Sequence, residues 1–211
     1  MAAGISGMSM THGSLIMYQS FNLLWWTLTA YLLIRLLKTD DPRWWLGIGA
    51  VFGLGMMTKY NMLVFVLGIV ASVLITPTRR HLRSPWLWAG VALSLLIFLP
   101  NLIWQFQHNF VALEFTGSIH ERDIEWGRTE NFLPEQLFVS ANPVTIPLWV
   151  MGLFFYLRSP AGRRFRMVGW IFIITFLLFF ILRARGYYTA GLLPHAISRR
   201  SGLFRAMACN P

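Results

Sequence analysis

A lysine between two apolar runs is the first residue whose type and position could do chemistry. Lys59 lies in the segment GLGMMTKYN (53–61), and the apolar run MLVFVLGIVASVLI follows it directly. The other lysine of the chain is Lys38. An ionisable residue at a membrane boundary is a functional-site hypothesis, and an ammonium group binds phosphate oxygens as a point charge. The alternative is snorkelling, in which the stem stays among apolar groups and the charge reaches water.

Two further segments carry groups that suit an anion or a sugar. The segment RARGYY (183–188) combines arginine, whose planar guanidinium bonds phosphate oxygens in pairs, with tyrosines that can stack on a sugar ring. The segment 100–110 holds Asn101, Gln105 and His108, which add hydrogen-bonding groups that a plain membrane anchor does not need. The alternative for both segments is an ordinary belt of interfacial residues.

The composition predicts that membrane helices carry these residues. The chain has 56% hydrophobic and 12% charged residues and a mean hydropathy of +0.55, whereas a soluble domain has about a quarter charged residues. We therefore expect an all-α fold, a polytopic transmembrane helical bundle. The net charge of +10 comes largely from short basic clusters between apolar runs, which favours membrane topology over nucleic-acid binding. The single cysteine, Cys209, excludes an internal disulfide, and no zinc-type spacing is present.

Six apolar runs are expected to cross the membrane. Several are shorter than the roughly 20 residues that a typical bilayer needs, so they must borrow flanking residues or thin the bilayer. In the second run, Gly49 and Gly53 form a GxxxG pair that lets another helix approach closely. Pro100 predicts a kink or a helix end in the fourth run. The runs are Phe21–Leu37, Trp44–Met57, Met62–Thr76, Trp86–Trp104, Val144–Leu157 and Val168–Leu182.

Alternate connectors are rich in arginine and should face the cytoplasm. The opposite side then receives Lys59, the long loop 105–142 and the RARGYY segment. That loop holds six of the chain's eight acids together with several aromatic residues, so we expect it to fold or to lie on the membrane surface. The basic residues of the alternate connectors are Arg35, Lys38, Arg43, Arg79, Arg80, Arg83, Arg158, Arg163, Arg164 and Arg166.

The chain accordingly divides into three parts. Residues 1–20 form an N-terminal segment on the outer side, and residues 21–184 form the membrane domain with the outer loop 105–142. Residues 185–211 form an atypical, basic tail.

Three stretches resemble bacterial members of glycosyltransferase family 39, which include dolichyl-phosphate-mannose protein mannosyltransferases and the lipid A aminoarabinose transferase. The resemblance covers roughly residues 15–194. The stretches are DDPRWWLGIGAVFGLGMMTKYNMLVF (40–65), PTRRHLRSPWLWAGVALSLLIFLPNLIWQFQHNF (77–110) and RARGYYTAGLLP (183–194). The strings GLGxxTKY, PNLIWQ and RGYY within them are the most specific.

The resemblance implies a partial GT-C-type fold in the bacterial inner membrane, with the long loop facing the periplasm. It implies transfer of a sugar from a polyprenyl-phosphate carrier to a periplasmic or lumenal acceptor, with membrane lipids as the surrounding partners. In this interpretation Lys59 and Arg185 hold the donor phosphate. Residues that line the sugar or lipid pocket are Tyr187, Tyr188, Asn101, Gln105 and His108.

One departure from the family pattern limits the enzyme hypothesis. Family members carry a catalytic aspartate in the first outer loop, but no acid precedes Asp40 here, so we expect a fragment that lacks this loop and assign no catalytic residue. Glu114, Asp123 and Glu125 are general-base candidates by residue type alone. No metal or cofactor is expected. The alternatives are a non-catalytic protein that binds the carrier lipid, an accessory membrane protein or an inactive truncated copy. A transporter or channel is less favoured because the runs contain few ionisable residues.

Overall fold

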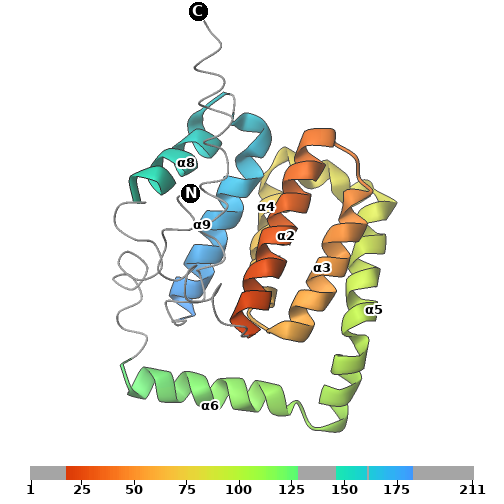
Figure 1. Cartoon of the computed structure of the whole chain (residues 1–211), viewed down its shortest axis with the longest axis vertical. Helices are drawn as coiled ribbons and strands as arrows, with labels where there is room; N and C mark the ends of the chain where they lie inside the picture. Colours follow the sequence, from red (N-terminus) through yellow and green to blue (C-terminus); the bar gives the residue numbers. More distant parts are fainter. Residues whose placement is uncertain (1–17, 128–145, 161, 183–211) are drawn as a thin grey trace, which may run out of the picture.

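The computed structural model describes residues 18–127, 146–160 and 162–182 (Figure 1). Helices and turns account for these ranges, and no strand occurs within them. The expected all-α membrane bundle is therefore confirmed. The elements are α2 (Tyr18–Thr39), α3 (Trp44–Thr58), α4 (Met62–Ile75), η2 (Pro77–Arg83), α5 (Pro85–Gln107), α6 (Val111–Glu125), α8 (Ile146–Arg158), η5 (Arg163–Phe165) and α9 (Arg166–Ile181).

Each of the six apolar runs contains a helix, because a segment in hydrocarbon must satisfy its backbone hydrogen bonds internally. Length and composition qualify three helices as membrane spans, Gln19–Thr39, Pro85–Gln107 and Arg163–Ile181. A fourth is the pair α4 and η2, which bends by 102° at its break. Helix α3 has 15 residues, and it rises only about 22 Å against a hydrocarbon core of about 30 Å. Three or four spans are thus supported, and the count of six crossings stays a prediction.

Helix α5 does not end at Pro100. It continues to Gln107 with the proline inside it, so of the two outcomes predicted at Pro100, a kink or a helix end, the helix end is wrong. A membrane helix tolerates proline because neighbouring groups re-satisfy the freed carbonyl. The extension matters because Gln105 belongs to the helix and not to a loop.

The closest helix packing joins α3 and α5. A Cβ atom at Gly49 would lie 2.0 Å from the carbonyl oxygen of Gly90, and one at Gly53 would lie 2.7 Å from Cβ of Ile97. These distances show that the backbones meet where side chains are absent, as the GxxxG pair predicts. Both helices start at the end of the bundle where Asp40 lies, so they run in the same direction (Figure 1).

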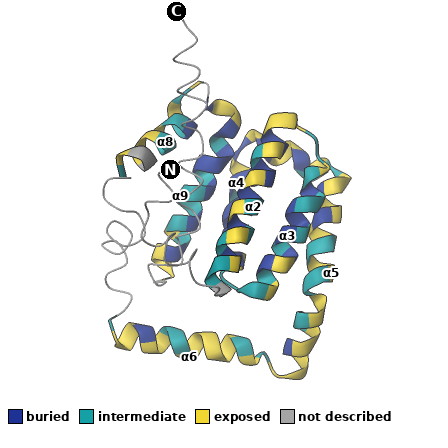
Figure 2. Ribbon diagram, in the orientation of Figure 1, coloured by how far each residue is buried: buried dark blue, intermediate teal, exposed yellow. Residues whose placement is uncertain are grey.

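Large aromatic side chains join α2, α4 and α9. The Trp26 ring stacks on Phe65 with centroids 4.4 Å apart and lies 6.2 Å from Phe179. All three side chains are almost completely buried. At Gly68 a Cβ atom would lie 2.1 Å from Oγ1 of Thr175, so α4 and α9 also approach closely. Figure 2 shows the buried residues facing inward on these helices.

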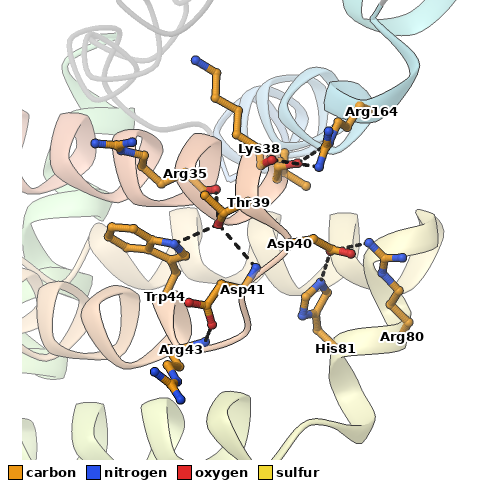
Figure 3. A network of polar contacts seen from close by, with 11 residues as sticks. Arg35, Lys38, Thr39, Asp40, Asp41, Arg43, Trp44, Arg80, His81 and Arg164 are labelled. Atoms are coloured by element: carbon orange, nitrogen blue, oxygen red, sulfur yellow. Dashed lines mark hydrogen bonds and ion pairs between the residues drawn. The ribbon is translucent and has the colours of Figure 1, made fainter.

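The three basic connectors meet at one end of the bundle, which we call the arginine end (Figure 3). Asp40 follows α2 with φ 60°, a left-handed conformation that aspartate tolerates better than most residues. Its carboxylate pairs with Arg80 of η2 and lies 3.4 Å from Nε2 of His81. Arg164 of η5 donates hydrogen bonds to the carbonyl oxygens of Leu37 and Lys38. The end of α2 thus holds both later connectors, and the prediction that the three share one end is confirmed.

The opposite end of the bundle carries Lys59 and the last turns of α5, and we call it the lysine end. Here α6 lies across the bundle at a steep angle to α5 (Figure 1). Asn109 and Phe110, with φ 52° and 56°, form the sharp turn between the two helices. The described part of the long loop is therefore folded, and most of α6 is exposed (Figure 2).

The glycine contact gives a direct test of the packing. We expect Gly49→Ala to lower the free energy of unfolding by about 1–3 kcal/mol, because its methyl group would overlap the Gly90 carbonyl. Gly47→Ala is the matched control, since its Cβ would make an ordinary 3.4 Å contact with Leu32. Thermal unfolding in detergent measures both variants. Equal stabilities would contradict the close α3–α5 contact.

Candidate functional site

Lys59 lies in a tight turn with a fixed backbone. It follows α3 with φ −160° and ψ 130°, and its N–H donates to the Gly55 carbonyl oxygen at 3.0 Å. The Lys59 carbonyl oxygen accepts from the Met62 N–H at 3.1 Å. On the other side of the turn, Nε1 of Trp25 donates to Oγ1 of Thr58 at 2.9 Å. These bonds hold the lysine, whose side chain is half-buried, at the boundary between two apolar helices.

The residue after Lys59 connects the turn to α5. The Tyr60 hydroxyl donates to Oδ1 of Asn101 at 2.9 Å and accepts from Nε2 of Gln105 at 2.8 Å. The edge of the Tyr60 ring also packs against Phe98. Asn101 and Gln105 were both predicted as pocket residues, and the structure brings them together through Tyr60.

Gln105 links this network to α6. Its side chain is buried with 6% exposure. Its Oε1 accepts from the Ala112 N–H at 3.3 Å, and its carbonyl oxygen accepts from the Phe110 N–H at 2.8 Å. A free N–H at the start of α6 is thereby satisfied, as a helix N-terminus requires. The predicted pocket residue is also the joint between two helices.

His108 does not join this group. Its ring stacks on Trp104 at 4.3 Å between centroids, and Nδ1 lies 2.8 Å from the Trp104 carbonyl oxygen. It is exposed and interacts with its own helix. Arg185, Tyr187 and Tyr188 lie outside the described residues. Helix α9, which leads towards them, starts near the arginine end and terminates at Ile181 near the lysine end (Figure 1).

Two asparagines that the sequence interpretation overlooked lie near the lysine. Asn61 begins α4, and both polar atoms of its side chain are buried without a hydrogen-bond partner among the described residues. Oδ1 of Asn22 on α2 is likewise buried and unpartnered within the described chain. Asn22 lies four residues before Trp26, and Asn61 lies four residues before Phe65. Because Trp26 and Phe65 stack and their helices run in the same direction, the two amides occupy facing positions one turn nearer the lysine end.

The stacked rings of Trp26 and Phe65 lie one turn from these amides, between α2 and α4. Buried amides without partners cost free energy, so each of them is suited to bind a polar group of a ligand or a water molecule. A polar residue four positions before an aromatic residue in an apolar run is the sequence signal that could have identified Asn22.

The acids of α6 differ in their environments. Glu114 and Glu125 are exposed, whereas Asp123 is buried with 3% exposure. Of the three general-base candidates, Asp123 is therefore the one in a protein environment. In the part of the chain that the structure describes, no three His, Cys, Asp or Glu side chains are grouped to hold a metal ion.

The comparisons with known proteins agree with the sequence resemblance. A family model described as dolichyl-phosphate-mannose-protein mannosyltransferase matches residues 4–104, a range that includes Lys59 and Asn101. A lipid A galacturonosyltransferase of Rhizobium johnstonii is 28% identical over 132 residues. The match covers 59% of this chain and 28% of the relative's length. No solved structure matches the chain.

The Tyr60 network predicts a measurable effect of one hydroxyl group. Tyr60→Phe should lower the free energy of unfolding by about 1–3 kcal/mol, because it leaves the buried Gln105 amide without its acceptor. Tyr31→Phe is the control, since the Tyr31 hydroxyl accepts only an exposed hydrogen bond from Arg35. Thermal unfolding in detergent compares the two. A Tyr60→Phe variant as stable as Tyr31→Phe would show that the network contributes nothing.

Proposed function

We propose that the chain is a glycosyltransferase family 39-like membrane protein that binds a polyprenyl-phosphate-linked sugar at the lysine end of its bundle. The whole-protein activity that follows from this family is transfer of that sugar to an acceptor outside the cytoplasm. The matched region spans 28% of the relative's length.

One observation carries the proposal: Lys59 is held in a rigid turn at a membrane boundary beside buried amide groups. The turn is bonded on both sides, at Gly55 and Met62, so the backbone position from which the lysine side chain extends is fixed. Phosphate is the anion that a lipid brings to this depth, and lysine binds it as a point charge. When the sugar leaves the carrier, negative charge develops on the phosphate, and a fixed positive charge stabilises it.

The unpartnered amides provide the second part of the donor site. Asn61 lies two residues after Lys59, and Asn22 lies opposite it on α2. Asparagine offers both a donor and an acceptor, which suits the hydroxyl groups of a sugar. Asn101 and Gln105 are already engaged with Tyr60. We therefore assign them to positioning of the turn, and we assign contact with the sugar to the two free amides.

The sidedness of the protein follows from the same proposal. It is an integral membrane protein with basic connectors at one end. Under the positive-inside rule that end faces the cytoplasm, and Lys59 faces the periplasm of a bacterial inner membrane. The carrier phosphate and the acceptor would then meet on the outer side, next to α6. Arg185 would add a second positive charge to the phosphate, and Tyr187 and Tyr188 would line the pocket with it. The division into residues 1–20, 21–184 and 185–211 stays a prediction.

A non-catalytic protein that binds the carrier lipid is the second candidate. It is favoured by the exposure of Glu114 and Glu125 on α6. The purified chain incubated with a radiolabelled polyprenyl-phosphate sugar distinguishes the two candidates. Release of the sugar to an acceptor supports the transferase, and binding without release supports the second candidate.

Substitutions that remove or keep the charge of Lys59 test its proposed role in phosphate binding. Lys59→Ala should weaken binding of a polyprenyl phosphate by about 10–100-fold, the effect expected for one charge-assisted hydrogen bond. Lys59→Arg should retain part of the affinity because it keeps the charge. Binding is measured by titration of the purified chain in detergent micelles.

Lys38→Ala is the control, because it removes the other lysine at the opposite end of the bundle. Its affinity should equal that of the unsubstituted chain. Unchanged affinity in Lys59→Ala would leave only snorkelling as the role of this residue.

Sidedness is tested with single cysteines in a Cys209→Ser background. We expect a membrane-impermeant maleimide added to spheroplasts to label Lys59→Cys and Arg185→Cys. Lys38→Cys should react only after the membrane is permeabilised. Labelling of positions 59 and 185 from different sides would overturn the proposed donor site.

A further inference from the structure

An apolar groove lies between α4 and α5, with α3 as its floor. Its volume is 380 Å³. The walls are almost wholly hydrocarbon, and the groove runs along the helices from Phe98 near the lysine end to Trp45 and Trp88 near the arginine end. The connector η2 joins α4 to α5, and its Leu82 lines the groove at the arginine end. The groove thus has the length and lining of a site for a hydrocarbon chain.

The arginine end of this groove is rimmed by positive charge. Arg43 immediately precedes α3, and its guanidinium lies 5.8 Å from the centre of the Trp86 ring on α5. Arg79 and Arg83 lie on η2 and are exposed. The helices α3 and α5 both start here, so their N-terminal dipoles add to the positive potential.

The nearby acids compensate this charge only in part. The carboxylate of Asp40 is engaged by Arg80 and faces His81. The side chain of Asp41 accepts a hydrogen bond from the Arg43 backbone N–H at 2.9 Å. The guanidinium groups of Arg79 and Arg83 form no ion pair with a described acid.

Trp45, one of the residues that line the groove, has a buried donor without a partner among the described residues. Trp45 is 6% exposed, and its indole Nε1 has no hydrogen-bond partner within the described residues. Oγ of Ser84, the residue before α5, is also buried and unpartnered there. An indole N–H in an apolar groove is costly unless a ligand oxygen meets it. A molecule with a hydrocarbon chain and anionic polar oxygens near one end fits this end of the bundle. Its chain would fill the groove, and its oxygens would accept hydrogen bonds and neutralise the positive charge.

We propose that this groove binds one anionic phospholipid. Its phosphate lies between Arg43 and Arg83, an acyl chain fills the groove over α3, and an ester or phosphate oxygen accepts from Trp45. Basic pockets between membrane helices bind such head groups. The head-group position at Arg43 and Arg83 is separate from the donor site, because α5 places the two at opposite ends of 23 residues, a rise of about 34 Å. The lipid belongs to the membrane leaflet at the arginine end.

Native mass spectrometry of the full chain in detergent tests the proposal, with phosphatidylglycerol and neutral phosphatidylcholine as probes. We expect phosphatidylglycerol to be retained about tenfold better than phosphatidylcholine. Arg43→Gln with Arg83→Gln should remove this preference by discharging the rim. Val91→Trp should reduce retention of phosphatidylglycerol several-fold by filling the groove, and the unfolding temperature checks that this variant is folded.

Arg158→Gln with Arg163→Gln is the matched control. It removes the same charge from the same end of the bundle, on α8 and η5, two helices that contribute no residue to the lining of the groove. It should retain phosphatidylglycerol as the unsubstituted chain does. If both double variants lost the same retention of phosphatidylglycerol, the preference would come from the total positive charge of this end and not from the groove, which would overturn the proposal. Displacement of phosphatidylglycerol by a polyprenyl phosphate would assign the groove to the carrier lipid and overturn it as well.

Discussion

The close contact of α3 with α5 determines what meets at each end of this bundle. Gly49 and Gly90 allow the two backbones to touch because neither residue has a side chain at the crossing. Two helices that run in the same direction at this distance must bring their starts together and their ends together. The Lys59 turn therefore lies beside the last turns of α5, and Tyr60 reaches Asn101 and Gln105. The arrangement of the proposed donor site follows from two glycines more than 10 Å along the helix axis from it, by an estimate of about 1.5 Å per residue.

The two ends of the bundle are held together by different groups, charged side chains at the arginine end and neutral hydrogen-bonding side chains near Lys59. At the arginine end, many cations are arranged around Asp40, which pairs with Arg80, while Arg164 is bonded to backbone carbonyl oxygens. These bonds fix the two later connectors to the end of α2. At the lysine end, neutral hydroxyl and amide groups build the framework, and the positive charge of Lys59 is placed next to it. The cation of Lys59 beside neutral hydrogen-bonding groups suits an incoming anion, whereas a crowded basic end is suited to membrane anchoring.

The sequence predicted those features that depend on residues close together in the chain. The apolar runs predict helices because hydrocarbon forces internal hydrogen bonding, and the Gly49–Gly53 pair predicts a close helix contact. It left a kink and a helix end both open at Pro100, since helix continuation depends on neighbours that re-satisfy a carbonyl group. It overlooked Asn22 and Asn61, because a buried unpartnered amide is recognised only when the facing helix is known. The pairing of Asn101 with Gln105 through Tyr60 also depends on helix direction and was beyond the sequence alone.

Gln105 has a mechanical consequence for the lysine end. The same side chain bonds the start of α6 through Oε1 and the Tyr60 hydroxyl through Nε2, and Tyr60 is covalently adjacent to Lys59. The outer helix α6 and the Lys59 turn are therefore connected through the two hydrogen bonds of one glutamine side chain. A tilt of α6 would displace the Gln105 amide group. Because this amide is bonded to the Tyr60 hydroxyl, the displacement would reach the residue next to Lys59.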